Sequence, residues 1–244
     1  RPWDNKHSYL PHEDHGWQTV APSATAFHDK DPVPQALTTE AIQHLVHAFS
    51  SAAARACDAG YQILEIHAAH GYLIHQFLSP LVNSRSDNYG GSFENRTRFL
   101  LEIVDAILPT LTKQSLWVRI SATDWAEGGW DSQQSVALAK ILKARGVAVI
   151  DVSSGGAVRQ QQIPVAAGYQ VPFAEQIKSE ANMITAAVGL INSGPQAEEI
   201  LQQKKADLIM IGRAFLENPH FVYQCAQELK TEIPWASQYA RAKK

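Results

Sequence analysis

Short apolar runs alternate with helix-like segments along most of this 244-residue chain, and that alternation limits the folds open to it. Five aliphatic runs have the length of strands, and a segment with helical periodicity follows each one. The runs cover residues 61–67, 116–121, 147–152, 183–188 and 208–211. Nearly continuous apolar strands indicate a parallel sheet covered by helices. The sequence therefore predicts an α/β fold built from βα units between residues 38 and 244.

Two arrangements of βα units are possible, an open doubly wound sheet and a closed barrel. An open nucleotide-binding sheet should carry a glycine-rich turn after its first strand. Here the first predicted strand ends in His67-Ala-Ala-His70 instead. We therefore predict a TIM (β/α)8 barrel, which needs eight strands. This chain would supply about five of them, strands 4–8, as a single domain over residues 1–244.

Capping residues mark the ends of the predicted helices. Thr38 or Thr39 can cap a first helix that stops at Gly60, and Asp131 can cap another that stops at Gly146. Residues 1–37 show neither the periodicity of a helix nor that of a strand, and they are predicted to form a loop. The chain opens on Arg1 in loop-like sequence, so we expect it to be part of something larger.

The composition limits the kinds of partner and environment that are expected for this chain. The formal net charge of -3 shows no basic excess, so nucleic acid is not expected as a partner. No apolar run approaches the roughly 20 residues that span a bilayer, so no membrane association is expected. The two cysteines, Cys57 and Cys225, lie far apart in sequence, which is typical of a reducing cytoplasm rather than of a disulfide scaffold.

Three residues that can carry chemistry lie at the carboxyl end of the first predicted strand: His67, His70 and Tyr72. Catalytic residues of α/β barrels lie at the carboxyl ends of strands. An isolated histidine is more often a structural hydrogen-bonding residue, but this close grouping favours a site. A metal site formed by His67, His70 and His75 is an alternative. Against it, the other strand ends provide cationic, hydroxyl and glycine residues, which suit an anionic ligand: Arg119, Ser121, Ser153, Ser154, Gly189, Gly212 and Arg213.

The last two strands end in glycine, at Gly189 and at Gly212-Arg213. Barrels commonly bind phosphate between the loops after their last two strands, against the N-terminus of a short helix. The glycines would let backbone N–H groups approach the phosphate, and Arg213 would add a charge-assisted contact. Two ordinary βα turns with a surface arginine are the alternative.

Arg119 lies within an otherwise apolar strand, where an unpaired charge would be costly. It must therefore meet an acceptor at the barrel mouth. An electron-rich ring edge that gains negative charge on reduction fits this requirement. An internal ion pair with Asp124 or Asp151 is the alternative.

With these residues in view, the chain resembles the old yellow enzyme family of FMN-dependent ene-reductases. The resemblance is carried by short motifs spread over nearly the whole chain. They are His67-Ala-Ala-His-Gly-Tyr-Leu, Gln76-Phe-Leu-Ser-Pro, Asn83 to Arg96, Val118-Arg-Ile-Ser, Gly168-Tyr-Gln, Gly212-Arg and Tyr239-Ala-Arg. The pair of histidines and the C-terminal Tyr-x-Arg resemble the thermophilic-like branch.

The resemblance implies roles for the residues of the first strand end and a use for the cofactor. His67 and His70 would hydrogen-bond the carbonyl or nitro oxygen of an activated alkene, and Tyr72 would protonate its α-carbon. FMN would deliver hydride to the β-carbon, and NADPH would reduce the FMN again. Arg119 would contact the pyrimidine edge of the flavin.

The resemblance also implies a phosphate site and an assembly. Gly189, Gly212 and Arg213 would bind the FMN phosphate. Arg241 would reach into the active site of a neighbouring subunit, which implies a homodimer or homotetramer; a solvated tail arginine is the alternative reading. The family's first three strands would precede Arg1, so a missing N-terminal segment would have to come from the same or another chain.

Two functions from other classes remain open at this stage. A catalytically silent barrel fragment, or assembly module, would keep these fold elements without binding flavin. A metal-dependent barrel hydrolase would use His67, His70 and His75.

Overall fold

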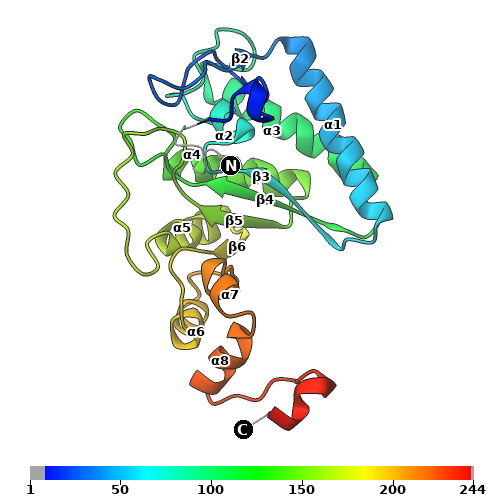
Figure 1. Cartoon of the computed structure of the whole chain (residues 1–244), viewed down its shortest axis with the longest axis vertical. Coiled ribbons are helices and arrows are strands. Elements are labelled where there is room, and N and C mark those ends of the chain that lie inside the picture. Colours follow the sequence, from blue (N-terminus) through cyan, green and yellow to red (C-terminus); the bar gives the residue numbers. More distant parts are fainter. Residues whose placement is uncertain (1–8, 243–244) are drawn as a thin grey trace.

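The computed structural model describes residues 9–242, and its centre is a parallel sheet of five strands (Figure 1). The strands are β3 (Ile63–Ala68), β4 (Ser115–Ser121), β5 (Val149–Ser153), β6 (Ile184–Ala187) and β7 (Leu208–Ile209). Their spatial order, β3-β4-β5-β6-β7, follows the sequence without reversal. A doubly wound sheet reverses its strand order, whereas a barrel does not. The predicted (β/α)8-barrel architecture, with five strands from this chain, is therefore confirmed.

Helices connect the strands and cover one face of the sheet. They are α1 (Thr39–Asp58), α2 (Leu73–Leu78), α3 (Phe93–Ile107), α4 (Ser132–Arg145), α5 (Val171–Ala181), α6 (Gly194–Gln202), α7 (Arg213–Glu217) and α8 (Phe221–Glu228). Short 3-10 helices occur at η2 (His12–Asp14), η3 (Leu108–Thr110) and η4 (Ser237–Ala242). Within residues 9–242, we find no helix with both the length and the apolar character needed to cross a membrane.

The predicted helix caps are present in the structure. The Thr38 hydroxyl accepts a hydrogen bond from the Ala41 N–H at 3.2 Å, and Asp131 accepts one from the Gln134 N–H at 2.8 Å. Gly146 ends α4 in the left-handed region, at φ 100°. These local bonds satisfy N–H and C=O groups that a helix end leaves without partners.

Some predicted boundaries were wrong. Residues 1–37 are not all loop, because Val20–Ala21 pairs in parallel with Gln35–Ala36 as strands β1 and β2; the first eight residues lie outside the described part. Two-residue strands show no readable period. The last long helix begins at Phe221, and just before it the Asn218 side chain accepts a hydrogen bond from the His220 N–H.

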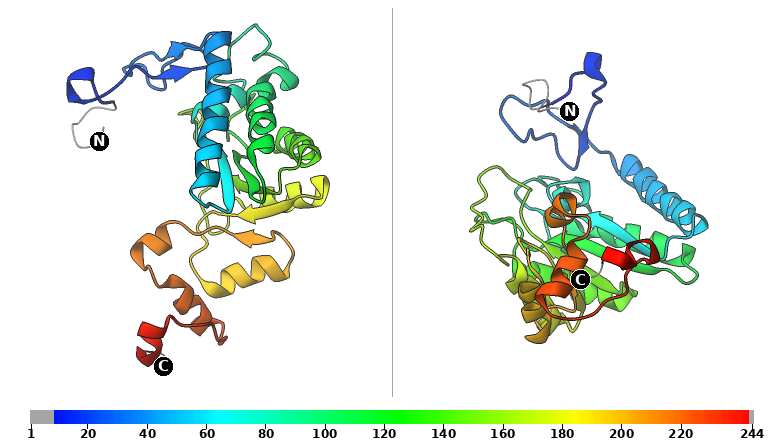
Figure 2. Two further views of the ribbon diagram at one scale, coloured as in Figure 1. Left: turned by 90° about the vertical axis from the view of Figure 1, so that its right-hand side faces the viewer. Right: turned by 60° about the horizontal axis from the view of Figure 1, so that its bottom comes forward.

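The two faces of the sheet differ in chemistry. Side chains such as Ile66, Val118 and Val152 are buried against the helices. On the opposite face, His67, Arg119 and Asp151 occupy one row across β3, β4 and β5. This face corresponds to the interior of the barrel, where alternate residues of each strand point. Figure 2 shows the N-terminal segment and the α7–α8 region projecting from opposite ends of the sheet.

Candidate functional site

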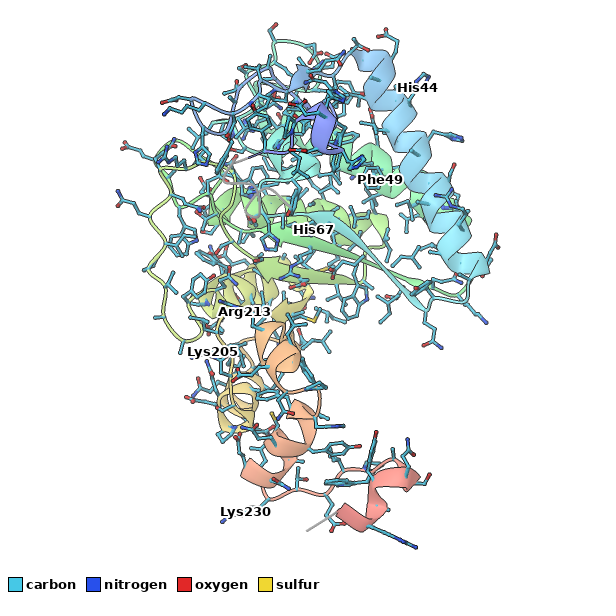
Figure 3. The ribbon with its side chains drawn as sticks, in the orientation of Figure 1. His44, Phe49, His67, Lys205, Arg213 and Lys230 are labelled. Atoms are coloured by element: carbon cyan, nitrogen blue, oxygen red, sulfur yellow. The ribbon has the colours of Figure 1, made fainter. Side chains whose placement is uncertain are left out.

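The structure brings His67, His70 and Tyr72 together at the carboxyl end of β3. The ring centroid of His67 lies 5.0 Å from that of His70 and 5.4 Å from that of Tyr72. His67 is in β3 and is exposed on the interior face (Figure 3), whereas His70 and Tyr72 lie on the turn into α2. Tyr72 is 64% exposed, so its hydroxyl is accessible to a small molecule.

Hydrogen bonds to the backbone N–H and carbonyl of Gly71 fix the turn that carries His70 and Tyr72. The Gly71 N–H donates to Nδ1 of His75 at 2.9 Å, and Nε2 of Gln76 donates to the Gly71 carbonyl at 2.7 Å. Both His70 and Gly71 are in the left-handed region, at φ 59° and 74°. A Cβ on Gly71 would lie 1.9 Å from the Gly156 carbonyl oxygen, so the two loops touch through bare backbone.

His75 is part of the support beneath this turn. It is fully buried, and its Nε2 lies 2.9 Å from Oδ1 of Asp124. Since Nδ1 accepts the Gly71 N–H, the ring proton is on Nε2 and is donated to Asp124. Asp124 also accepts hydrogen bonds from the Ser79 hydroxyl and the Trp130 N–H, at 2.7 and 2.8 Å.

These hydrogen bonds argue against the alternative prediction of a metal site formed by His67, His70 and His75. Both nitrogens of His75 are engaged, so it cannot be the third imidazole of a site with His67 and His70. Within residues 9–242, His, Cys, Asp and Glu side chains form no group of three or more that could hold a metal ion. The metal-dependent hydrolase therefore has no support in the geometry of the histidines.

Both histidines of the cluster are shifted toward the neutral form. Burial lowers the pKa of His70 to about 4, and the positive charge of Arg119 adds to the effect. The pKa of His67 is lowered by the same two causes, in the same order. A neutral imidazole carries one N–H and one bare nitrogen. Near pH 7 the cluster thus presents hydrogen-bond groups rather than imidazolium cations.

Arg119 lies in the same row as His67, and its nearest charge is that of Asp151. Nε of Arg119 is 3.2 Å from Oδ2 of Asp151, a close charge contact without hydrogen-bond alignment. Neither that Nε nor either Asp151 oxygen has a hydrogen-bond partner among residues 9–242. The predicted alternative, an ion pair, is thus present with Asp151 and not with Asp124, and it leaves Arg119 with donor capacity to spare.

Asp151 is expected to make stability depend on pH. Burial raises its pKa from 3.8 to about 7, with Arg119 opposing and Glu65 reinforcing the rise. Between these two values the folded chain holds a proton that the unfolded chain has lost, so the free energy of unfolding falls as pH rises through this window. Between pH 4 and pH 8 this group should lower the free energy of unfolding of the wild type by about 4 kcal/mol, and Asp151→Asn should remove that loss. Urea unfolding of both proteins at pH 4 and pH 8 measures it; parallel pH dependence in the two would contradict the expectation.

The predicted phosphate residues follow the last two strands. Gly212 precedes α7, and a Cβ there would meet nothing within 4 Å. Arg213 begins α7, is exposed (Figure 3), and has no ion-pair partner within residues 9–242. Gly189 has φ 122°, and a Cβ there would lie 2.9 Å from Nε2 of Gln170, so packing already requires this glycine. The open position of Gly212 and Arg213 leaves room for an anion at the start of α7.

Sequence reasoning gave no role to Gln170, which connects the ends of β5 and β6. Its Oε1 accepts a hydrogen bond from the Ser154 hydroxyl at 2.6 Å, and its Nε2 donates to the Val188 carbonyl at 3.1 Å. It is almost completely buried. The Gly168-Tyr-Gln motif contained the signal, but only the fold shows which groups the amide reaches.

A cavity of about 830 Å³ lies beside the cluster. It is enclosed by the N-terminal segment, including Trp17 and Phe27, and by the loops around Gly71 and Val158. It borders the His70–Tyr72 turn at Gly71 and is not lined by the rings of the cluster. Its volume is in the range of small-molecule sites.

A sequence profile of the NADH:flavin oxidoreductase / NADH oxidase family matches residues 2–232. The chain belongs to this family. The match covers all three elements of the site: the β3 turn, the β4–β5 row and the start of α7. It confirms the resemblance that the histidine and tyrosine motif predicted, and FMN is the cofactor of the family.

Individual relatives of the chain are found as well. It is 50% identical over 222 residues to an NADPH dehydrogenase of Bacillus velezensis and 53% identical over 223 residues to one of Halalkalibacterium halodurans. Each alignment covers 91% of this chain and 65% of the relative, so the chain spans about two-thirds of their length. Morphinone reductase in complex with tetrahydroNAD superposes with a TM-score of 0.73 and 28% identity, over 92% of this chain and 64% of the other.

The residues present fit FMN on two observations. Arg119 has a buried Nε without a hydrogen-bond partner in the described part of the chain, which suits the acceptor edge of a flavin ring. Gly212 offers free space at a helix start, and Arg213 has no ion-pair partner in the part of the chain that the structure describes, which suits a phosphate. The family's cofactor and these two places agree in charge and in hydrogen-bond character.

Arg241 is not near the cluster within one chain. It lies in η4, which follows α8 at the far end of the molecule from β3 (Figure 1), and it is exposed. A role for Arg241 in substrate binding would require a second copy of the chain.

Proposed function

We propose that this chain belongs to an FMN-dependent ene-reductase, which reduces the C=C bond of α,β-unsaturated carbonyl or nitro compounds with NADPH as the reductant. The observation that carries the proposal is the grouping of His67, His70 and Tyr72, two neutral imidazoles and a phenol, on one side of a strand end. Arg119, in the same row as His67, adds a positive charge beside the place where a flavin would lie.

In this function the two histidines bind the substrate oxygen. Their neutral rings each offer an N–H, and two such donors stabilise the negative charge that develops on a carbonyl or nitro oxygen. FMN, when bound, supplies the hydride for the β-carbon. Tyr72 holds its proton on an exposed hydroxyl and delivers it to the α-carbon. Arg119 orients the cofactor edge and balances negative charge there, while Gly212 and Arg213 hold the phosphate.

Reduction of bound FMN by NADPH, followed by its reoxidation with an alkene, tests the proposed function directly. Protein reconstituted with FMN should be yellow, should bleach with NADPH under anaerobic conditions, and should regain its colour when cyclohexenone is added. Protein that stays colourless in excess FMN would overturn the proposal for this chain and favour the silent barrel module. If the colour bleached with NADPH but did not return with the alkene, flavin binding would be supported and the proposed substrate class would be contradicted.

The substrate oxygen site can be tested separately with a phenol, whose oxygen resembles an enolate. His67→Ala is expected to weaken binding of a para-substituted phenol about tenfold or more, because it removes one hydrogen bond to a charged oxygen. The change in visible absorption of the FMN-loaded protein measures binding. His44→Ala, at an exposed position on α1 (Figure 3), is the control and should bind as the wild type does. Equal affinities in all three proteins would place the oxygen elsewhere.

The same proposal implies the substrates of the chain and its partner subunit. Small activated alkenes are the substrates, and Arg241 would complete the site of a neighbouring copy in a homodimer or homotetramer. Both cysteines are free in the structure, consistent with the cytoplasmic location predicted from their number and spacing.

A further inference from the structure

His70 makes one side-chain contact that its place on the turn does not require. Its Nε2 lies 2.6 Å from the hydroxyl of Ser153, the last residue of β5. Ser153 is buried and belongs to a strand separated from β3 by β4. Since the neutral ring of His70 has one proton, the nitrogen that carries it decides whether the ring donates or accepts toward the open side of the cluster.

The hydrogen bonds behind Ser153 have fixed directions. Nε1 of Trp125 can only donate, and it donates to the Ser154 hydroxyl at 2.9 Å. A backbone carbonyl can only accept, so the 3.1 Å contact with Val188 identifies the NH₂ group of Gln170 and turns its Oε1 toward the serines. The Ser154 hydroxyl donates to that oxygen at 2.6 Å. The Gln170 oxygen therefore accepts the Ser154 proton and, with its second lone pair, is the alternative acceptor for the Ser153 proton.

The proton of Ser153 goes to His70. The alternative acceptor, Oε1 of Gln170, is 3.4 Å from the Ser153 hydroxyl, beyond the usual range of an O–H···O bond. His70 Nε2, at 2.6 Å, is within it. An Nε2 that accepts this proton leaves the ring proton on Nδ1, the nitrogen that does not contact Ser153.

We propose that Ser153 is a positioning residue that fixes His70 as the Nδ1–H tautomer, so that His70 donates a hydrogen bond to the oxygen of the substrate. The Ser153 hydroxyl is much closer to His70 than to Gln170, at 2.6 Å against 3.4 Å, and this difference keeps its proton directed at His70. The contribution of the tautomer to substrate binding rests on the proposed function; the tautomer itself does not.

Solid-state NMR of protein labelled with ¹⁵N in histidine can observe this tautomer. The sequence contains 10 histidines, and His70 is assigned by the signal that disappears in His70→Asn. In the wild type, with or without FMN, we expect the proton of His70 on Nδ1. In Ser153→Ala the Nδ1–H form should fall to half or less, because Nε2 loses its donor. Ser153→Thr keeps a hydroxyl and should restore the wild-type tautomer.

Ser154→Ala is the matched control, since Ser154 is the adjacent buried serine and does not contact His70. It should leave His70 as the Nδ1–H tautomer. A wild-type His70 with its proton on Nε2 would overturn the proposal without any variant. An unchanged tautomer in a folded Ser153→Ala protein would overturn it as well.

Kinetics separate this inference from the proposed function. Ser153→Ala should slow alkene reduction about tenfold, less than the hundredfold or greater loss when a donor is removed outright. Reduction of FMN by NADPH should change less than about twofold, since His70 is not expected to act in that step. An equal slowing of both half-reactions would reject the positioning role. A wild type with the Nδ1–H tautomer and no alkene reduction would reject the function and leave the tautomer assignment intact.

Discussion

Tyr72→Phe is expected to slow alkene reduction by about 10²- to 10⁴-fold, the usual contribution of a positioned proton donor. The substitution removes one oxygen from an exposed ring whose centroid is 5.4 Å from that of His67. It leaves the two histidines available to bind the substrate oxygen, so the affinity for phenols should change little. Reduction of FMN by NADPH needs no proton from Tyr72 and should stay within about twofold of the wild type. Stopped-flow absorption measures the two half-reactions separately.

Tyr61 provides a matched control for this experiment. Tyr61 and Tyr72 are both 64% exposed, and Tyr61 lies just before the amino end of β3, at the opposite end of the strand from the cluster. Tyr61→Phe should reduce alkenes at the wild-type rate. Equal slowing of both half-reactions in Tyr72→Phe would assign Tyr72 to cofactor binding rather than to proton donation.

The long elements of the fold could be predicted from the sequence because each carries its own signal. Helix α1 has twenty residues, a threonine cap and an apolar stripe that repeats over several turns. Helices α2 and α7 have six and five residues, too few for a period to appear, and sequence analysis did not assign them. The pairing of β1 with β2 depends on residues fifteen positions apart and leaves no local pattern.

The residues of the candidate site also differ in how far the sequence alone could predict their roles. His67, His70 and Tyr72 are close in sequence, so one strand end was enough to group them. The contact between Arg119 and Asp151 depends on the register of β4 against β5, and sequence analysis left it as one of two alternatives. The bond from Ser153 to His70 joins residues 83 positions apart, and no pattern of residue types specifies it. Side-chain roles that depend on strand register required the structure.

Gly71→Ala is expected to destabilise the protein by about 4 kcal/mol and to displace the turn that carries His70 and Tyr72. Alanine at φ 74° has a conformational cost of about 1–2 kcal/mol. Its Cβ would also lie 1.9 Å from the Gly156 carbonyl oxygen, and a backbone atom cannot move aside as a flexible side chain can. Relieving that overlap in a packed region typically costs a further 1–3 kcal/mol. The turn cannot shift freely, because Gly71 is bonded through its N–H to His75 and through its carbonyl to Gln76.

Gly60→Ala separates the two contributions. Gly60 has a similar positive φ of 86°, but a Cβ there would meet nothing within 4 Å. Its replacement should therefore cost only the conformational part, about 1–2 kcal/mol, and should leave phenol binding unchanged. Urea unfolding gives both stabilities, and a phenol titration of the FMN-loaded proteins reports on the cluster. If the two variants lost equal stability and bound phenol equally well, the contact between the Gly71 and Gly156 backbones would not hold the turn, and His75 and Gln76 alone would position His70 and Tyr72.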